Sequence, residues 1–162
     1  MATATKTKRL GEKEGFRTVP KWGVRLVKEE GYKYDSSRPV DCPDAVRSLL
    51  EQYFQDLDRE HFATIHLDRK GGVLGINTVS IGGLFTSIAH PREVFKPAII
   101  LGTSSLILAH NHPSGDPEPS KEDLGTTKRL VECGELLGIE ILDHIILGDN
   151  GRYCSFKSRG LI

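Results

Sequence analysis

Apolar and polar residues alternate in some segments of the chain, and in others the apolar residues recur at helical spacing. Alternation over 61–67 and 73–81, on either side of the turn sequence DRKGG, predicts a β-hairpin. Apolar residues three and four positions apart predict a helix within 42–57. The same reasoning predicts further helices over 90–101 and 121–137, and further strands over 104–110, 139–147 and 152–156.

Turn and cap residues indicate where these elements begin and end. Pro91 suits the first position of a helix, Ser120 the N-cap of the next, and Gly138 the end of that helix. Pro97 falls inside a short helix and is expected to kink or shorten it. Weak alternation over 22–30 suggests one more short strand. The interleaved order predicts an α/β fold with a mixed β-sheet flanked by helices.

Charge is distributed unevenly along a chain whose formal net charge is zero. Residues 1–38 hold ten Lys or Arg and five Asp or Glu, so they carry +5, and the remainder carries −5. We expect a flexible basic leader over 1–40, with the possible short strand, and one folded domain over 41–162. Nucleic-acid binding is expected to be weak and to reside in the leader, because the body lacks a strongly basic face.

Composition bears on the compartment. The first residues have no apolar signal-peptide core, and no segment approaches the ~18 apolar residues of a membrane span. The three cysteines lack C-x-x-C spacing, which argues against a disulfide framework and against a thiolate zinc site. These features predict a cytoplasmic protein without a membrane partner, and they leave the oligomeric state open.

The stretch LAHNHPSGDPEPSKEDL, residues 108–124, carries the candidate chemistry. His110 and His112 are two positions apart on an extended segment, so their imidazoles project from the same side. Asp123 stands in the first turn of the helix that Ser120 caps, with a fixed direction. Two imidazoles and one carboxylate form a three-ligand zinc site, in which bound zinc lowers the pKa of a water molecule to ~7.

Other interpretations of this stretch stay open. The pattern Ser120-x-x-Asp123 is also a capping box, which is commonly structural. Asp116 and Glu118 are rival carboxylate ligands, but the proline-rich loop would hold a ligand less firmly than a helix does. We therefore predict zinc bound by His110, His112 and Asp123.

The spacing His110-x-His112, seven residues, then Ser120-x-x-Asp123 matches the JAMM motif of MPN-domain metalloproteases. The wider pattern, including HPREVFKPAI and LGIEILDHIILG, closely resembles the bacterial RadC family of JAB domains over roughly 40–160. This resemblance implies the JAB1/MPN fold, which is similar to that of cytidine deaminases. It also implies a zinc-dependent hydrolase that cleaves a peptide or isopeptide bond.

The resemblance assigns roles to individual residues. His110, His112 and Asp123 correspond to the family's zinc ligands, and Ser120 to the serine that helps to stabilise the tetrahedral intermediate. Glu60 matches the glutamate at the start of an early strand, which takes the proton of the attacking water. A separate physical reason supports Glu60, because a carboxylate there reaches the site if strand 61–67 runs beside the strand that ends at His110. Asp58 is the nearest rival base.

Alternative functions remain to be distinguished. The resemblance also suggests a DNA-repair-associated factor that processes or binds nucleic acid, and a metal-bearing scaffold without turnover is a third possibility. A deaminase requires H-x-E and P-C-x-x-C, and neither pattern occurs. HNH nucleases spread their motif residues over a ββα element, unlike the tripeptide at 110–112.

Several other residues invite a chemical interpretation. Asp143 and His144 are adjacent on a strand, so they point to opposite faces, and either one is expected to be structural or to orient a ligand histidine. Cys133 falls at helical spacing among apolar residues and is expected to pack in the core. The histidines expected to be ordinary surface or strand residues are His61, His66 and His90.

Overall fold

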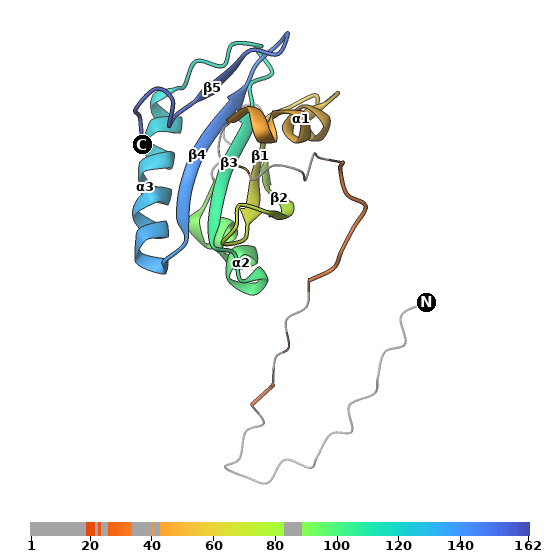
Figure 1. The fold of residues 1–162 in the computed structure, drawn as a ribbon, viewed down its shortest axis with the longest axis vertical. Coiled ribbons are helices and arrows are strands. Elements are labelled where there is room, and N and C mark those ends of the chain that lie inside the picture. Colours follow the sequence, from red (N-terminus) through yellow and green to blue (C-terminus); the bar gives the residue numbers. More distant parts are fainter. Residues whose placement is uncertain (1–18, 22, 24–25, 34–39, 41–42, 83–88) are drawn as a thin grey trace.

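The computed structural model describes residues 19–21, 23, 26–33, 40, 43–82 and 89–162 (Figure 1). Three helices and five strands follow one another along this part of the chain. They are α1 (Pro43–Phe54), β1 (His61–Leu67), β2 (Val73–Ile81), α2 (Pro91–Leu101), β3 (Ser105–Asn111), α3 (Lys121–Leu137), β4 (Glu140–Leu147) and β5 (Tyr153–Ser155).

The five strands form one mixed sheet in the order β2-β1-β3-β4-β5. Strands β3 and β4 are parallel, and α3 connects them; every other neighbouring pair is antiparallel. The predicted α/β fold, a mixed sheet flanked by helices, is therefore confirmed. Since β3 is the central strand, the side chains at its end are held by neighbours on both sides.

Helices cover both faces of the sheet and make two hydrophobic cores. On one face, α1 buries Leu49 and Leu50 against residues of β1, β3 and β4 such as Ile65 and Ile107. On the other face, α2 and α3 bury Phe95 and other apolar side chains against β3 and β4. Cys133 is partly buried at this second core, so its predicted packing role is confirmed. The opposite faces of β3 therefore have different surroundings.

Helices α2 and α3 end at glycines in the left-handed conformation. Gly102 has φ 67° and Gly138 has φ 68°, a backbone region that residues with a Cβ rarely adopt. The end predicted at Gly138 for the helix over 121–137, which is α3, is thus confirmed. Of the two effects predicted for Pro97, a kink or a shorter helix, the second is wrong, because α2 continues to Leu101. Proline removes one backbone bond from the helix, and burial of Val94 and neighbouring residues on the same helix offsets that loss.

The N-terminal segment contradicts part of one sequence prediction. Residues 26–33 lie in no helix or strand, so the short strand predicted over 22–30 is wrong for 26–30. Leu26 and Val27 are 49% and 83% exposed, which means that the weak alternation has no apolar surface to pack against. Of the flexible leader predicted over 1–40, residues 1–18, 22, 24–25 and 34–39 lie outside the described residues.

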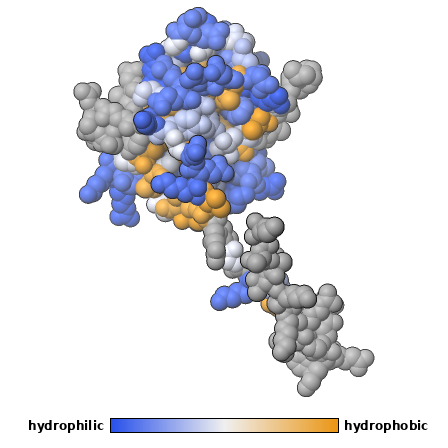
Figure 2. Space-filling view, turned by 90° about the vertical axis from the view of Figure 1, so that its right-hand side faces the viewer, coloured by the Kyte–Doolittle hydropathy of each residue, from blue (hydrophilic) through white to orange (hydrophobic). Residues whose placement is uncertain are grey.

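The surface of the described residues is largely hydrophilic, and apolar side chains gather at the lower end of the folded part in Figure 2. Exposed apolar residues include Ile99 and Ile100, near the end of α2. This end of α2 leads into the start of β3, whereas the candidate chemistry lies at the other end of that strand. Within the described part of the chain, the helices are too short or too polar to cross a membrane.

The predicted strand histidine His66 is fully buried in β1. Its ring nitrogens lie 3.1 Å from Thr64 Oγ1 and 3.0 Å from Thr103 Oγ1. Burial lowers the pKa of His66 from 6.5 to about 4. The other two histidines of that group lie nearer the surface: His61 begins β1, and His90 caps α2.

Lowering the pH from about 6.5 to about 4 is expected to destabilise the fold through His66. In this window the unfolded chain binds a proton at His66 and the folded chain does not, so stability falls as the pH falls. One pKa unit corresponds to about 1.4 kcal/mol, so the loss from this residue is on the order of 3 kcal/mol. Urea unfolding of the metal-free protein at several pH values measures it. His66→Gln should lose less stability over the same window, and identical pH slopes for the two proteins would contradict the prediction.

Candidate metal centre

His110 and His112 occupy the end of the central strand. His110 is fully buried on the face covered by α2 and α3, where its ring stacks on Phe62 at a centroid distance of 5.8 Å. The backbone N–H of His112 donates to the carbonyl of Leu147 at 2.8 Å, which keeps this residue beside β4 just after β3 ends. Both imidazoles are therefore presented from backbone that the sheet fixes.

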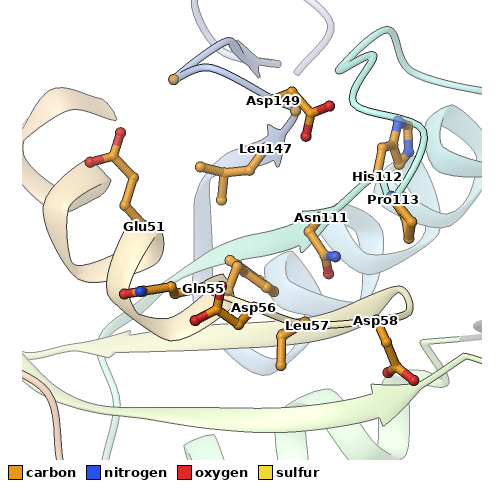
Figure 3. Close-up of a pocket in the computed structure, with 13 residues that line it drawn as sticks. Glu51, Gln55, Asp56, Leu57, Asp58, Asn111, His112, Pro113, Leu147 and Asp149 are labelled. Carbon is orange, nitrogen blue, oxygen red and sulfur yellow. The ribbon is translucent and has the colours of Figure 1, made fainter.

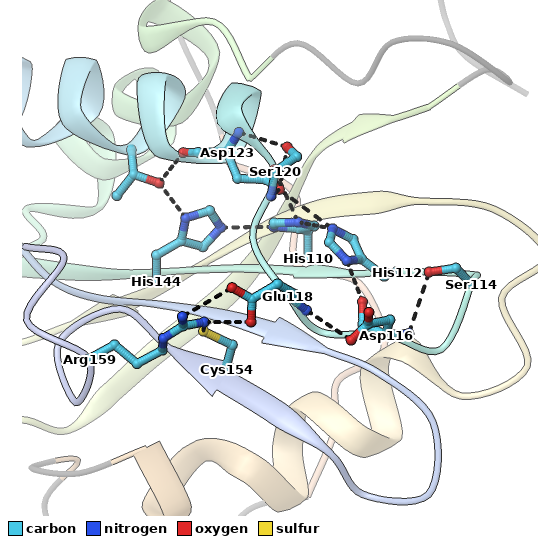
Figure 4. Close-up of polar contacts among 11 residues, drawn as sticks. His110, His112, Ser114, Asp116, Glu118, Ser120, Asp123, His144, Cys154 and Arg159 are labelled. Atoms are coloured by element: carbon cyan, nitrogen blue, oxygen red, sulfur yellow. Dashed lines mark hydrogen bonds and ion pairs between the residues drawn. The ribbon is translucent and has the colours of Figure 1, made fainter.

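The structure brings the three predicted ligands together (Figure 4). One ligand atom from each of His110, His112 and Asp123 lies within 4.8 Å of the other two. His110 Nε2 is 3.3 Å from one Asp123 carboxylate oxygen, and His112 Nε2 is 3.6 Å from the other. The two Nε2 atoms are 3.0 Å apart. Three donor atoms thus converge on one point at the start of α3.

A capping box at the start of α3 aims the carboxylate of Asp123. Ser120 is the N-cap, and its hydroxyl accepts the backbone N–H of Asp123 at 3.1 Å. In return, Asp123 Oδ2 accepts the backbone N–H of Ser120 at 2.7 Å and its hydroxyl at 2.6 Å. The capping and ligand interpretations of this motif are therefore compatible, because the cap holds the carboxylate that faces the histidines.

The donor set fits a zinc ion. His112 Nδ1 lies 2.7 Å from the backbone carbonyl of Asp116. A carbonyl only accepts, so Nδ1 carries the hydrogen, and Nε2 of the neutral ring presents its lone pair to His110 and Asp123. Two imidazole nitrogens and one carboxylate oxygen are ligands that zinc commonly takes at catalytic sites.

Electrostatics around the three residues favour a cation between them. Burial alone would raise the pKa of Asp123, but the neighbouring His112 and His110 rings and the hydrogen bonds from Ser120 hold it well below its usual range. The neighbouring Asp123 carboxylate raises the pKa of His112 despite burial. Burial lowers the pKa of His110 to about 4. The carboxylate is thus ionised at neutral pH, and a proton on His112 competes with a metal for the same atoms.

Glu60, the predicted base, immediately precedes β1. The antiparallel register pairs Phe62 of β1 with His110 of β3, and continuing it places Glu60 level with His112 and on the same side of the sheet. The condition set by the sequence, that these strands run side by side, is met. Burial, followed by the charge of Asp123, raises the pKa of Glu60. This carboxyl therefore lies within the electrostatic reach of the cluster.

Asn111 fastens the entry of β1 beside the cluster. Its side chain points away from the face of His110, as expected for the residue between two same-side histidines. Its carbonyl oxygen accepts the backbone N–H of His61 at 2.8 Å, and its amide donates to the backbone carbonyl of Arg59 at 3.1 Å. These two bonds flank Glu60 in sequence, so they fix the backbone that carries it.

The rival carboxylates are engaged elsewhere. The Asp116 carboxylate accepts the backbone N–H of Glu118 at 3.3 Å, and the backbone carbonyl of Asp116 accepts from His112 Nδ1. Glu118 makes a two-pronged ion pair with Arg159, at 2.8 and 3.0 Å, which ties the proline-rich loop to the C-terminal segment (Figure 4). Asp58 is exposed and makes a two-pronged pair with Arg59, at 2.8 and 2.7 Å. The loop therefore supports His112 through its backbone.

Asp143 and His144 have separate surroundings. The Asp143 carboxylate accepts the hydroxyl of Ser155 at 2.6 Å. The ring of His144 is fully buried against His110 and Thr127, on the other face of the strand. Thr127 is not among the residues predicted from the sequence. Its position four residues after Asp123, on the same side of α3, was the signal that could have identified it.

A cavity of about 560 Å³ lies beside the end of the sheet (Figure 3). It shares His112 with the metal cluster and Asn111 with the opposite face of β3. Its acidic lining residues are Glu51, Asp56, Asp58 and Asp149. The cavity therefore borders the cluster from the side of α1, whereas His110 faces α3.

Comparison with known sequences places this site in a family. A family model described as RadC-like JAB domain matches residues 40–161, about three quarters of the chain. The chain belongs to the RadC-like JAB domain family. The matched region includes all the candidate site residues of this chain, from Glu60 to Asp123.

Several UPF0758 proteins are relatives of this chain. A UPF0758 protein of Syntrophomonas wolfei is 47% identical over 160 residues, which cover 99% of this chain and 68% of the relative. A UPF0758 protein of Desulforamulus reducens is 54% identical, over 76% of this chain and 54% of the relative. Another, of Methanosarcina mazei, is 48% identical, over 82% of this chain and 58% of the relative. The chain thus spans roughly half to two thirds of the length of these relatives, and their names state no activity.

Proposed function

We propose that this chain is a zinc-dependent hydrolase of the JAMM type that cleaves a peptide or isopeptide bond. The observation that carries the proposal is the convergence of His110, His112 and Asp123, each with a ligand atom within 4.8 Å of the others. When bound by two imidazoles and one carboxylate, zinc keeps a position for water and makes that water nucleophilic at neutral pH. His110, His112 and Asp123 would hold it.

Glu60 is proposed to move the proton. Hydrolysis adds the oxygen of water to the carbonyl carbon and breaks the carbon–nitrogen bond. One proton of the water passes to the Glu60 carboxylate and then to the leaving amine nitrogen. The raised pKa of Glu60 supports this role, because a carboxyl that titrates closer to neutral pH holds a proton long enough to deliver it.

Ser120 is proposed to have two roles. Its hydroxyl donates to Asp123 Oδ2, and this bond orients the ligand carboxylate. The same hydroxyl would donate to the developing negative charge on the substrate oxygen, as the resemblance to JAMM proteases implies. The second role requires the hydroxyl to rotate away from Asp123 during the reaction.

The substrate is proposed to be a peptide or protein, with nucleic acid a weak partner at most. The formal charge of residues 39–162 is −5, which disfavours binding to phosphates. A screen of the zinc-loaded chain against a peptide library, lysine-linked isopeptides and DNA, with and without chelator, tests the proposal. Asp123→Asn serves as the control for contaminating enzymes.

Cleavage of a peptide or isopeptide that chelator abolishes, that added zinc restores and that Asp123→Asn lacks would support the hydrolase. Cleavage confined to DNA under the same controls would favour the nucleic-acid-processing alternative. Zinc binding without cleavage of any of these substrates would favour a metal-bearing scaffold and contradict the proposal.

A further inference from the structure

A chain of three hydrogen bonds runs from His110 to the backbone of α3, on the side of the ring opposite the candidate metal ligands (Figure 4). His110 Nδ1 lies 2.8 Å from His144 Nε2. His144 Nδ1 lies 2.6 Å from the hydroxyl oxygen of Thr127, and that hydroxyl donates to the carbonyl of Asp123 at 2.6 Å. The side chains of His110, His144 and Thr127 are 0%, 0% and 1% exposed, so water does not compete for these bonds.

The directions of these bonds follow from what each group is able to donate. The backbone carbonyl of Asp123 only accepts, so it receives the single hydrogen of the Thr127 hydroxyl. The hydroxyl oxygen must then accept from His144, which puts the ring hydrogen of His144 on Nδ1. The His144 ring is fully buried between His110, Thr127 and Phe156, an environment that disfavours a charged ring, so its Nε2 has a lone pair and accepts from His110 Nδ1. The remaining nitrogen of His110, Nε2, is left with its lone pair facing the other candidate ligands, His112 Nε2 at 3.0 Å and Asp123 Oδ1 at 3.3 Å.

Packing prevents the two rings from turning. His110 stacks on Phe62 with an interplanar angle of 12°, and the His144 ring lies 4.7 Å from that of Phe156 between centroids. A histidine that is fully buried among such neighbours does not flip its ring without opening the core. Packing therefore keeps Nε2 of His110 toward the other ligands, and the position of the ring hydrogen decides whether that nitrogen is free to bind a metal.

We infer that Thr127 and His144 are positioning residues that hold His110 in the tautomer with a free Nε2. Their consequence for zinc rests on the proposed function, whereas the tautomer is a property of the metal-free protein. Partners that orient a metal-binding histidine in this way commonly change metal affinity by about 10–100-fold when they are removed.

Thr127→Val separates this role from packing, because valine has nearly the volume of threonine and lacks the hydroxyl. Without that acceptor, the Nδ1 hydrogen of His144 is buried without a partner, which favours the opposite tautomer. His144 Nε2 then donates to His110 Nδ1, and the hydrogen of His110 moves to Nε2, where it blocks the metal. Thr127→Ser keeps the hydroxyl and is the matched control.

Two measurements on the full chain test the inference. Nitrogen-15 NMR of histidine-labelled, metal-free protein identifies the protonated nitrogen of each ring, and competition with a chromophoric chelator gives the zinc affinity. We expect wild type and Thr127→Ser to keep the hydrogen on His110 Nδ1. Thr127→Val is expected to move it to Nε2 and to bind zinc about 10–100-fold more weakly. Thermal unfolding checks that all three proteins are folded.

Each outcome separates the two proposals. A wild-type tautomer and wild-type zinc affinity in folded Thr127→Val would overturn the inference and leave the proposed hydrolase intact. An unchanged tautomer with weaker zinc binding would also overturn it, because the effect would then come from packing. If the wild-type chain binds no zinc, the proposed function fails, and the NMR comparison still decides whether Thr127 sets the tautomer.

Discussion

Replacing Glu60 with glutamine is expected to lower the rate of peptide or isopeptide hydrolysis by ~10²-fold or more while zinc stays bound. Glutamine has nearly the size of glutamate but cannot accept the proton of the attacking water. Glu60 immediately precedes β1, level with His112 in the strand register and outside the group of three ligand residues. The substitution should therefore remove proton transfer and keep the metal. The turnover rate and the zinc content, measured on the same sample, test both expectations.

Asp58→Asn is the matched control for this substitution. Asp58 is two residues away, exposed and paired with Arg59, so its loss should leave both rate and zinc content near those of the wild type. Wild-type turnover by Glu60→Gln, or loss of its zinc, would show that Glu60 is not the base. A large rate loss in Asp58→Asn alone would assign the role to the rival carboxylate.

Substituting His112 with alanine is expected to weaken zinc binding more strongly than the loss of a residue that only hydrogen-bonds to a metal ligand, which commonly costs ~10–100-fold in affinity. The substitution removes one of three ligand residues. The remaining two, His110 and Asp123, are fewer than the three protein ligands that a catalytic zinc site commonly has. Elemental analysis of protein purified without added metal, together with chelator competition, measures the loss. We expect one zinc per wild-type chain.

His61→Ala serves as the control for the ligand substitution. His61 is the first residue of β1, and its backbone N–H, which bonds Asn111, is retained in the variant. Its zinc content should equal that of the wild type. Full zinc occupancy in folded His112→Ala would contradict the ligand assignment.

Segments with strong local signals were predicted with their bounds. The strands 61–67 and 73–81 and the helix 121–137 match β1, β2 and α3 residue for residue. Alternation or helical spacing, turns and caps all agree in these segments. The strand predicted over 22–30 had only weak alternation, and a sheet partner for it could not be read from the pattern. Local pattern alone therefore failed where tertiary packing had to decide.

The candidate site divides in the same way. The convergence of His110, His112 and Asp123 depends on local geometry, namely same-side positions on a strand and a capped helix start, so the sequence was sufficient to suggest it. The supporting contacts depend on the fold. Thr127 reaches His144 only because α3 packs against β4, and a backbone carbonyl such as that of Asp116 leaves no signal in the sequence.

Anomalous diffraction from crystals of the zinc-loaded chain, recorded on both sides of the zinc absorption edge, tests the metal centre most directly. We predict one strong peak per chain at bonding distance, about 2 Å, from Nε2 of His110, Nε2 of His112 and a carboxylate oxygen of Asp123. The Glu60 carboxylate should face the remaining coordination position without binding the metal. A peak held instead by Asp116 or Glu118, or no peak in the presence of excess zinc, would contradict the account.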